Sequence, residues 1–349
     1  MNNGVEPVKI GIIGLGRAGY GMHCKELRDK TNLFQITAGC DPIVSRMETL
    51  SQEFGSKSYE RIEDLVNDSN VELVDIASRS NDHFTHGMMA LEAGKDIVLE
   101  KPMTLNVQEA EKLVETALKK GKNIYVRHNR RYDPDFLHVM ELINSGILGE
   151  IHSIKLSRHS YNRRNDWQTL KEFGGGQLLN WGPHIIDHAL CLLQSPIIHI
   201  WSHLDQILAA GDAEDHLKVI LTGENGRIAD IEISGAVALP SPTYQINGSK
   251  GSLSLIGKEI RLKRLHPDVQ FQPIHADPET PPQIGNFNNV EELKWVEEVI
   301  PVSPAIQYDF WDELYRSIRF RESFRIQISE AMDVVKVISQ VRRNTRFES

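Results

Sequence analysis

One short stretch, from Val8 to Gly19, limits what this chain can fold into more than any other. An apolar run that ends at Ile13 is followed directly by three glycines in the spacing G-x-G-x-x-G. The run has the length and the β-branched side chains of a strand buried on both faces. The residues after the glycines, up to Leu27, can form a helix. Because the chain holds 25 glycines in 349 residues, the flanking strand and helix are what give the spacing weight.

A strand, a glycine-rich turn and a helix in this order are typical of proteins that bind a dinucleotide. Gly14 would form the tight turn, Gly16 would let a pyrophosphate approach the backbone, and Gly19 would let helix and strand pack closely. The phosphates would lie at the helix N-terminus, where free N–H groups and the helix dipole favour an anion. The predicted cofactor loop consists of Gly14, Leu15, Gly16, Arg17, Ala18 and Gly19. The alternative is a glycine-rich turn that binds nothing.

A second strand that ends in an acidic residue, about 20 positions after the last glycine, is the expected companion of this loop. Residues 34–40 form that strand, and Asp41 follows Gly19 by 22 positions. The Asp41 carboxylate can accept hydrogen bonds from the adenosine ribose and would repel a 2′-phosphate, so NAD is favoured over NADP. Arg46 could bind such a phosphate if Asp41 turned away, which keeps NADP as the alternative.

Length, charge and cysteine content narrow the class of protein. Single cores stop growing at about 250 to 300 residues, so 349 residues indicate two domains. A formal net charge of −9 argues against a nucleic-acid partner, which would require a basic surplus. No apolar run reaches the roughly 18 residues of a membrane span, and no signal peptide is recognised. Three widely spaced cysteines indicate a reduced, cytoplasmic protein.

The first half of the chain alternates between helix and strand. Helices are expected over residues 45–54, 62–66, 83–93 and between Asn106 and Gly121, and strands over 34–40, 71–77, 96–99 and 123–126. Such alternation is the signature of a doubly wound α/β fold with a parallel sheet, which binds ligands at the carboxyl ends of its strands. We therefore predict an NAD(P)-binding Rossmann domain over residues 1–127.

The pattern changes after about residue 147. Strands are expected over 147–158, 196–208, 217–222, 227–237 and 253–256, with a hairpin turn at Asn225-Gly226. One clear helix is expected over 177–193, a long surface loop over 267–289, and two final helices over 308–320 and 329–343. Residues 128–349 are thus predicted to form an α+β domain with a mainly antiparallel sheet, whose last helices could pack back on the first domain.

Three groups of side chains could carry chemistry, and the first is Glu100-Lys101-Pro102. Lys101 lies just beyond the strand over 96–99, at the edge where such sheets bind ligands. Pro102 restricts the backbone beside it. We predict that the Lys101 ammonium group points toward the cofactor crevice. The alternative is a solvated surface lysine.

The second group lies on the early helix predicted for the second half. On a continuous helix, Asn180, His184 and either Asp187 or His188 share one face. An imidazole titrates near neutral pH, so His184 could take a proton from a hydroxyl group as hydride leaves its carbon. The alternatives are a capping or core histidine and a metal pair formed with His188. Pro183 removes a helical hydrogen bond, so we expect a kink or a late helix start there.

The third group stands at the boundary between the two halves. Asn129 and Arg130 could hydrogen-bond sugar hydroxyls or a carboxylate, and they could equally form interdomain salt bridges. A polar, aromatic loop precedes the early helix and has the composition of loops that bind carbohydrate, although other mobile loops share it. Its notable residues are Tyr161, Arg163, Arg164, Asp166 and Trp167.

These motifs together resemble those of one protein family. They are Gly14-Leu15-Gly16-Arg17-Ala18-Gly19, Leu91-Glu92-Ala93-Gly94-Lys95 before Glu100-Lys101-Pro102, Asn129-Arg130-Arg131, and the stretch from Gly174-Gly175-Gly176 through His184 and Asp187. Over most of its length the chain is similar to the glucose-fructose oxidoreductase, inositol dehydrogenase and MocA family (Gfo/Idh/MocA). The resemblance implies a Rossmann domain, an open antiparallel sheet that forms a homodimer or homotetramer, and NAD(P)-linked oxidation or reduction of sugars and polyols.

The resemblance also implies roles for individual residues. Lys101 would hydrogen-bond the reacting hydroxyl group and contact the nicotinamide, His184 would be the acid/base, and Asn180 would stand beside them in the catalytic group. The implied cofactor contacts beyond the glycine loop are Asp41, Arg46, Ser78, Arg79, His83, Glu100 and Lys101. The substrate contacts are expected to be Asn129, Arg130, Trp167 and Asp187.

Two positions depart from the family pattern. Many members have proline where Arg79 stands, so the loop over the cofactor is expected to differ. Many redox-active members have aspartate where this chain has Asn180. Because an amide cannot stabilise an imidazolium ion as a carboxylate would, His184 is expected to be a weaker base, with Lys101 or Asp187 carrying more of the chemistry.

The sequence thus predicts an oxidoreductase that moves a hydride between NAD and a secondary alcohol of a small sugar, polyol or derivative. No metal, membrane or nucleic acid is expected to take part. A dinucleotide-sensing regulator without catalysis is one alternative, with Asn180 as the sign of lost chemistry. A redox-assisted enzyme that cleaves glycosides is another.

Overall fold

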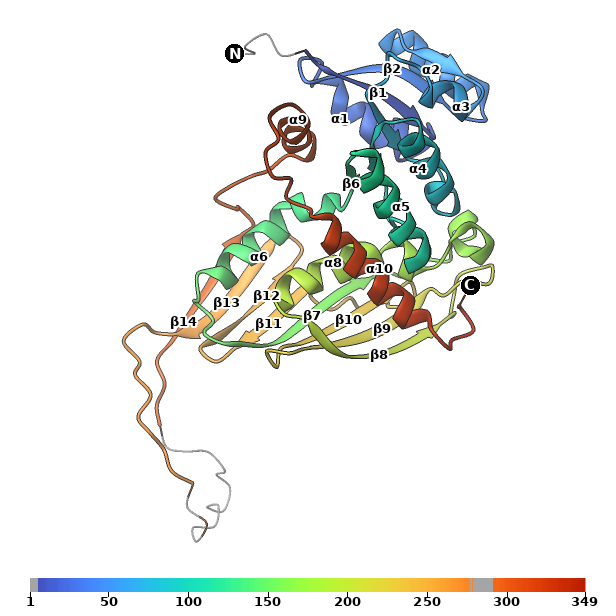
Figure 1. Ribbon diagram of the computed structural model, residues 1–349. Coiled ribbons are helices and arrows are strands. Elements are labelled where there is room, and N and C mark those ends of the chain that lie inside the picture. Colours follow the sequence, from blue (N-terminus) through green and yellow to red (C-terminus); the bar gives the residue numbers. More distant parts are fainter. Residues whose placement is uncertain (1–5, 277, 279–290, 349) are drawn as a thin grey trace.

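The chain forms two sheets, seen one above the other in the computed structural model, which describes residues 6–276, 278 and 291–348 (Figure 1). The first sheet has six strands in the order β3-β2-β1-β4-β5-β6, and every neighbouring pair is parallel. The strands are β1 (Val8–Ile13), β2 (Phe34–Cys40), β3 (Lys57–Tyr59), β4 (Leu73–Ile76), β5 (Asp96–Leu99) and β6 (Ile124–Val126). The predicted doubly wound parallel sheet is confirmed.

The helices of this half lie where the alternating pattern indicates. They are α1 (Lys25–Arg28), α2 (Val44–Phe54), α3 (Ile62–Val66), α4 (His83–Glu92) and α5 (Val107–Lys120). A π-helical turn, Gly19–Cys24, comes directly before α1. Asn106 caps α5 by accepting a hydrogen bond from the Glu109 backbone N–H. The short β3 is not predicted by the sequence, because its three residues are polar and mostly exposed.

The second sheet has eight strands in the order β14-β13-β12-β11-β7-β10-β9-β8. They are β7 (Ile151–His159), β8 (Ile197–Asp205), β9 (His216–Gly223), β10 (Ile228–Ser234), β11 (Tyr244–Gly248), β12 (Gly251–Ile256), β13 (Glu259–Leu265) and β14 (Trp295–Pro301). The pair β7 and β10 is parallel and the other pairs are antiparallel. The mainly antiparallel sheet is therefore confirmed, as is the Asn225-Gly226 turn between β9 and β10.

One face of this sheet is covered by helices α6 (Pro134–Asn144), α8 (Gly182–Leu193) and α10 (Ile328–Arg342), as Figure 1 shows. The sequence analysis expected one clear early helix and missed α6. The signal was present, because Pro134 occupies the first turn and Phe136, Val139 and Ile143 recur at helical spacing on its buried face. Strands β11, β13 and β14 were also missed.

The two final helices join the halves. Phe310 and Trp311 of α9 (Phe310–Phe320) belong to the same buried cluster as Val8 and Phe34 of the first sheet. In α10, Val335 packs with the buried cluster of the first half, while Val334 packs with that of the second half. Burial of each such side chain contributes roughly 1.5 to 3 kcal/mol. The helices that end the chain therefore stabilise the position of one sheet relative to the other.

The described residues that follow β13, up to 276, extend away from the sheet in Figure 1. The predicted loop over 267–289 begins there. Residues 267–276 contain neither helix nor strand, and residues 277 and 279–290 lie outside the described part of the chain.

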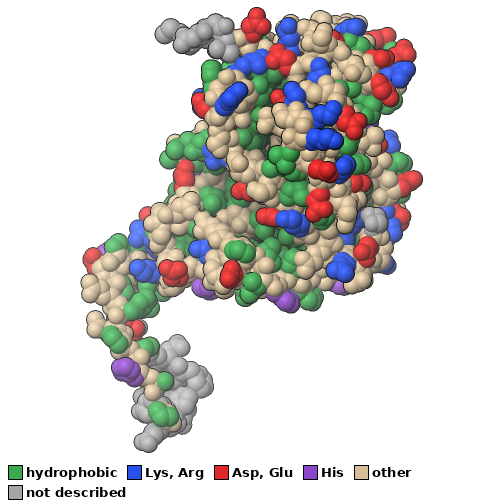
Figure 2. All heavy atoms as spheres, viewed as in Figure 1, with side chains coloured by type: hydrophobic (Ala, Val, Ile, Leu, Met, Phe, Trp, Pro, Cys, Tyr) green, Lys and Arg blue, Asp and Glu red, His purple; other side chains and the backbone are tan. Residues whose placement is uncertain are grey.

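Two surface properties bear on partners. On the face drawn in Figure 2, acidic and basic side chains lie interspersed. Within the described ranges, no helix has both the length and the apolar character needed to cross a membrane.

Candidate active site

The glycine loop after β1 forms a cradle that is least crowded at Gly16. Gly14 has φ +89°, and a Cβ there would lie 2.7 Å from the Ala77 carbonyl oxygen. A Cβ on Gly19 would collide with the Gly14 carbonyl, whereas one on Gly16 would approach only the end of the Arg46 side chain, at 3.8 Å. The backbone is therefore tightly packed on the inner side and accessible at Gly16. This cradle fits the pyrophosphate of a dinucleotide.

Asp41 and Arg46, the two residues that bear on cofactor choice, lie together at the end of β2. The Asp41 carboxylate is 4% exposed and accepts hydrogen bonds from the backbone N–H groups of Leu15 (2.7 Å) and Ile43 (2.8 Å). Arg46 Nη1 lies 3.3 Å from Asp41 Oδ2 and its side chain is 43% exposed. A ribose hydroxyl group and a 2′-phosphate thus each have a candidate partner at this position.

His83 connects the loop after β4 to the turn that carries Lys101. Its Nδ1 lies 2.7 Å from the Pro102 carbonyl oxygen and its Nε2 lies 3.3 Å from the Ser78 carbonyl oxygen. Burial lowers the pKa of His83, so the ring is neutral and donates one N–H, to the closer Pro102 carbonyl. The Ser78 hydroxyl group contacts His86 Nδ1 at 2.9 Å. His83 therefore holds the loop expected near the cofactor.

Arg79 reaches from the first half to the polar loop of the second. Its guanidinium carbon lies 4.8 Å from the centre of the Phe173 ring and 5.9 Å from that of Trp167. Cation–π attraction stabilises this contact. A proline at this position could not make it, so the departure from the family pattern creates a link between the two halves.

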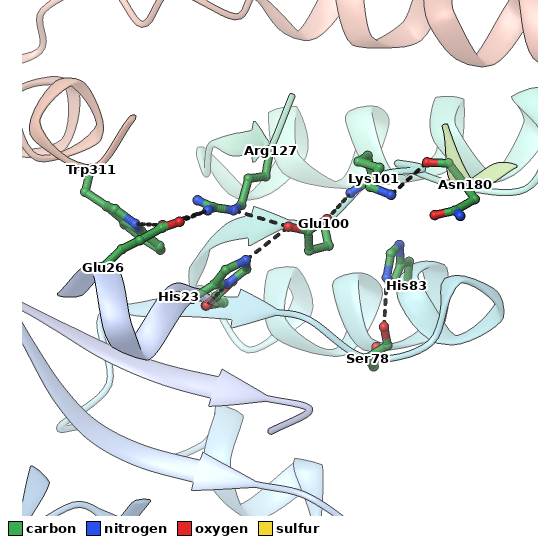
Figure 3. Close-up of polar contacts among 10 residues, drawn as sticks. His23, Glu26, Ser78, His83, Glu100, Lys101, Arg127, Asn180 and Trp311 are labelled. Atoms are coloured by element: carbon green, nitrogen blue, oxygen red, sulfur yellow. Dashed lines mark hydrogen bonds and ion pairs between the residues drawn. The ribbon is translucent and has the colours of Figure 1, made fainter. Parts of the chain in front are cut away.

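Lys101 and Asn180 meet across the two halves (Figure 3). The Lys101 ammonium group donates a hydrogen bond to the backbone carbonyl oxygen of Asn180 at 2.8 Å, whereas the Asn180 side-chain oxygen accepts from Gln168 Nε2 at 3.4 Å. Burial lowers the pKa of Lys101, and the charges of Arg17, Arg130 and Arg164 lower it further, although Glu100 opposes them. A lysine with a lowered pKa exchanges protons more readily near neutral pH.

Glu100, directly before Lys101, lies in a buried ionic network. Its Oε1 contacts His23 Nε2 at 3.0 Å, and its Oε2 accepts a hydrogen bond from the Lys101 backbone N–H at 3.1 Å. His23 Nδ1 lies 2.7 Å from Asp75 Oδ2. Burial and Arg127 lower the pKa of His23, but the charges and hydrogen bonds of Asp75 and Glu100 outweigh them and leave it raised. The two carboxylates thus favour the protonated form of His23.

Arg127 extends the network to the end of the chain. Its Nε lies 3.2 Å from Glu100 Oε1, and its Nη2 lies 2.7 Å from Glu26 Oε2. The Trp311 indole N–H of α9 donates to the same Glu26 oxygen at 2.7 Å. Figure 3 shows these contacts in a row that runs from Trp311 through Glu26 and Arg127 to Glu100, beside Lys101. They hold the strand end that carries the lysine.

Sequence reasoning missed this network, although it left a signal. Asp75 is a carboxylate within the apolar strand β4 and is 0% exposed, and a buried charge requires a partner. The partners His23 and Glu100 are 52 and 77 positions away, so the spacing along the chain did not reveal them.

The early helix is interrupted, as the presence of Pro183 led us to expect. It consists of α7 (Gln177–Asn180) and α8 (Gly182–Leu193), with Trp181 between them and Pro183 in the first turn of α8. Asn180 therefore ends one helix and His184 begins the next. The expectation that both lie on one face of a continuous helix is wrong, because the chain is not continuously helical between them.

His184 is 5% exposed and has no carboxylate beside it in the part of the chain that the structure describes. Burial lowers its pKa well below the ordinary value, and the charges of Lys101, His128 and His188 lower it further. Its Nδ1 is buried and finds no hydrogen-bond partner among the described residues. His184 is therefore a neutral imidazole that can accept a proton but holds it weakly.

His188 and Asp187 are bound within the protein. His188 stacks on Phe136 at 3.9 Å and its Nδ1 lies 2.8 Å from the Tyr244 hydroxyl oxygen. Asp187 is 1% exposed, and both its oxygens accept hydrogen bonds from Arg131, at 2.6 and 2.7 Å. Its role as a substrate contact stays a prediction, and its surroundings favour positioning of α8. Within the described ranges, no group of three or more His, Cys, Asp and Glu could hold a metal ion.

Arg130 and Asn129 lie in a 3-10 turn, Asn129–Tyr132, directly after β6. Arg130 Nη1 lies 3.0 Å from Asp133 Oδ2, an ion pair within the same turn and not one between domains. The Arg130 guanidinium carbon lies 5.4 Å from the centre of the Trp181 ring, at the break between α7 and α8. The turn thus places Arg130 beside the His184 region.

The parallel sheet, the glycine cradle and the Lys101 turn define the class: a dinucleotide-binding oxidoreductase with a second, sheet-containing domain. Two family models match the chain, one described as an oxidoreductase family with an NAD-binding Rossmann fold over residues 8–128, the other as a GFO/IDH/MocA C-terminal domain over residues 136–254. The chain belongs to the GFO/IDH/MocA oxidoreductase family, which confirms the resemblance seen in its sequence.

Relatives extend over the whole chain or most of it. The scyllo-inositol 2-dehydrogenase (NADP(+)) IolW of Bacillus subtilis is 28% identical over 346 residues, which covers 98% of this chain and 95% of that protein. The myo-inositol 2-dehydrogenase of Thermotoga maritima is 27% identical, covering 70% of this chain and 74% of that protein. A crystal structure of an NAD-binding protein from Listeria innocua matches with a TM-score of 0.79 and 25% identity, covering 96% and 93% of the two chains.

Proposed function

We propose that this protein is an NAD(P)-dependent dehydrogenase or reductase that acts on a CH–OH group of a sugar, a polyol or a derivative. One observation carries the proposal: Lys101, at the end of β5 beside the cofactor cradle, touches the helix break that also holds His184. The names of the relatives from Bacillus subtilis and Thermotoga maritima, both inositol dehydrogenases, support this substrate class.

The cofactor, when bound, supplies or accepts the hydride. Lys101 then hydrogen-bonds the reacting oxygen and polarises it, since its ammonium group lies where the two halves meet, at the Asn180 backbone carbonyl. His184 takes the hydroxyl proton in oxidation and returns it in reduction. Glu100 and its partners fix the lysine, and the Arg131–Asp187 ion pair fixes α8 and thereby His184. Catalysis rests mainly on holding these groups in position.

We propose that residues 1–127 bind the cofactor and residues 128–349 bind the substrate. NAD is the proposed cofactor, because the Asp41 carboxylate is held by two backbone N–H groups in the position to bind ribose. Arg46 makes NADP the alternative, and the name of the Bacillus subtilis relative includes NADP(+). Fluorescence titration of the protein with NADH and with NADPH distinguishes the two by their dissociation constants.

We also propose that the protein forms a homodimer or homotetramer through the outer face of the eight-stranded sheet. The strand alternation puts apolar side chains on the side opposite the core. They include Trp201, Ile228, Ile256 and Val299, all exposed. Exposed apolar patches on a sheet favour association. Light scattering at several protein concentrations measures the oligomer mass.

The test of the function is turnover of NAD with a panel of inositols and sugars, with and without Lys101→Ala. This substitution is expected to reduce kcat about 10³-fold while the NADH dissociation constant changes only about threefold. Lys119→Ala removes an exposed lysine of α5 and is the matched control. An unchanged rate in Lys101→Ala would remove this lysine from the mechanism.

Other outcomes select the alternatives. Tight NADH binding without turnover of any polyol would favour a dinucleotide sensor, for which Asn180 and the lowered pKa of His184 would be the reason. Cleavage of a glycoside without net NADH would favour the redox-assisted glycosidase.

A further inference from the structure

Two arginines contact one indole ring at the edge of the candidate site. The Arg158 guanidinium carbon lies 4.1 Å from the centre of the Trp181 ring, and that of Arg130 lies 5.4 Å from it. The Trp181 ring centre is in turn 5.8 Å from that of His184. Three separate elements thus converge here: β7, the turn after β6, and the break between α7 and α8. Sequence analysis did not single out Arg158 or Trp181.

Arg158 projects from the inner face of its sheet. Along β7, Ile154 and Leu156 are buried beneath the helices, and Arg158 continues the same alternation. Its side chain therefore leaves the sheet on the side of α8 and the candidate site. Leu156 pairs with Ile231 of β10 and Tyr244 of β11, so this strand lies inside the sheet and its direction is firmly held.

The two guanidinium groups carry more positive charge than the neighbouring carboxylates neutralise. In the described residues, Arg158 has no carboxylate within ion-pair distance, and burial together with the charge of Arg130 lowers its pKa. Arg130 is paired with Asp133, yet its Nε is buried and has no hydrogen-bond partner within the described ranges. Lys101 adds a further cation nearby, whose pKa is lowered by burial and by Arg130. This local surplus contrasts with the net charge of −9 for the whole chain.

We propose that the substrate carries an anionic group, a carboxylate or a phosphate, which Arg130 and Arg158 bind over the Trp181 ring next to His184. The substrate is then a sugar acid, or a sugar or polyol phosphate, and not a neutral sugar. This inference rests on the proposed function and specifies its substrate. A guanidinium group presents paired N–H donors that match the oxygens of both anions.

Such an anion would also supply what the His184 side of the site lacks. Asn180 is uncharged, and the Asp187 carboxylate is occupied by Arg131. A negative charge bound near Trp181 would therefore offset the cations around His184 and favour its protonated form as it takes up the hydroxyl proton. The substrate, and not the protein, would provide the counter-charge for the imidazolium ion.

The test compares matched pairs of ligands with the full-length protein loaded with NADH. Glucuronate against glucose and galacturonate against galactose form the carboxylate arm, and glucose 6-phosphate and myo-inositol 1-phosphate against their neutral parents form the phosphate arm. At least one anion is expected to bind tenfold or more tightly than its parent. Binding is measured by calorimetric titration, and turnover is measured separately with NAD.

Variants assign that preference to the two arginines. Arg158→Gln and Arg130→Gln are expected to lower the anion-to-parent affinity ratio about tenfold each, which corresponds to about 1.4 kcal/mol. Arg158→Lys keeps the charge and should retain most of the ratio. Arg316→Gln, which removes an exposed arginine of α9, is the control and should leave the ratio unchanged. If Arg158→Gln fails to fold, Arg158→Lys and competition between anion and parent on the unmodified protein decide.

The outcomes separate this inference from the function itself. Neutral parents that bind as tightly as the anions, or a ratio that Arg158→Gln leaves intact, would overturn the proposed anion site even if polyols are oxidised. Anion preference without any turnover of NAD would overturn the dehydrogenase function and leave the anion site standing.

Discussion

The two sides of the candidate site differ in how their charges are balanced. On the first side, the residue before Lys101 is Glu100, whose carboxylate contacts both His23 and Arg127. On the second side, His184 has no carboxylate partner among the described residues, and the nearest one on its helix, Asp187, is held by Arg131. The carboxylate beside Lys101 is paired with cations of the protein, whereas His184 has no carboxylate partner among the described residues.

This difference shows how a site can be rigid and still depend on its ligand. Buried charges need partners. On the Lys101 side, these partners come from the π-helical turn Gly19–Cys24, from β4 and from α9. The lysine is therefore held in position before any ligand arrives. On the His184 side, burial and then the neighbouring positive charges lower the pKa of the imidazole, so its ability to hold a proton depends on what binds beside it.

Removal of the central carboxylate should have the largest effect on stability. Glu100→Gln leaves His23 and Arg127 without their shared partner, and breaking such a buried pair costs about 3 to 5 kcal/mol of the free energy of unfolding. Urea denaturation measures it, with Glu92→Gln, at an exposed position of α4, as control. A loss as small as that of the control would mean that the network does not stabilise the fold.

The pH dependence of stability should distinguish the two sides. Burial lowers the pKa of His188 to about 4, against 6.5 for the ordinary side chain. Between these values the unfolded chain binds more protons, so stability falls as the pH drops from 6.5 toward 4, by about 3 kcal/mol for this group. His188→Gln should flatten this slope in urea denaturation at several pH values, and His199→Gln, on β8, is the control.

The contribution of His23 to stability has the opposite pH dependence. Its pKa is raised in the folded protein, so its contribution is complete below the pKa of the unfolded chain and is lost as the pH rises through the folded value. A His188→Gln variant whose stability falls with acid as steeply as that of the unmodified protein would contradict the assignment of this slope to His188.

A carboxylate introduced on the His184 side, which has no carboxylate partner among the described residues, should make the charge balance of the two sides more alike. Asn180→Asp adds a negative charge to the residue whose backbone carbonyl accepts the Lys101 hydrogen bond, four positions before His184, so both pKa values are expected to rise. The acidic limb of the kcat/KM profile should move about one unit toward higher pH. Asn70→Asp, in the loop before β4 at the amino ends of the strands, is the matched control. An unchanged limb would mean that His184 is not the group that titrates.

The smallest effect is expected at the far end of the network. Trp311→Phe keeps the ring in the core but removes the N–H that donates to Glu26, which costs about 1 kcal/mol of stability. Thermal unfolding measures it against Trp295→Phe, where the tryptophan is exposed. A loss similar to that of Glu100→Gln would show that the network acts as one unit and not as separate contacts.

Local patterns predicted most elements because each depends on neighbours in the chain. Residues 34–40 and 96–99 were identified as strands with the bounds of β2 and β5, and Asn106 and Gly121 were identified as the ends of α5. Strands β11, β13 and β14 were not identified. Only the pairing with other strands makes a sheet of them.

The candidate site could be predicted only in part, for the same reason. Sequence spacing singled out Lys101 and His184 as separate motifs, and the conformation at Pro183 was anticipated correctly. Sequence spacing could not predict that Arg158 contacts Trp181 or that Arg79 contacts Phe173, because these contacts join residues from different elements. The break at Trp181 also changed the relation between Asn180 and His184 that a continuous helix would have imposed.

The amino-acid sequence alone determined the dinucleotide cradle, the alternation of the first half and the change to an antiparallel pattern in the second. These features follow from hydrophobic period and from glycine geometry, which act over a few residues. Tertiary structure decided which charges meet. His23, Glu100 and Arg127 become one network, and Arg130 and Arg158 contact one indole ring, only after the chain is packed. A charge is stabilised by the groups that surround it in space, and the spacing of residues along the chain does not reveal which groups these are.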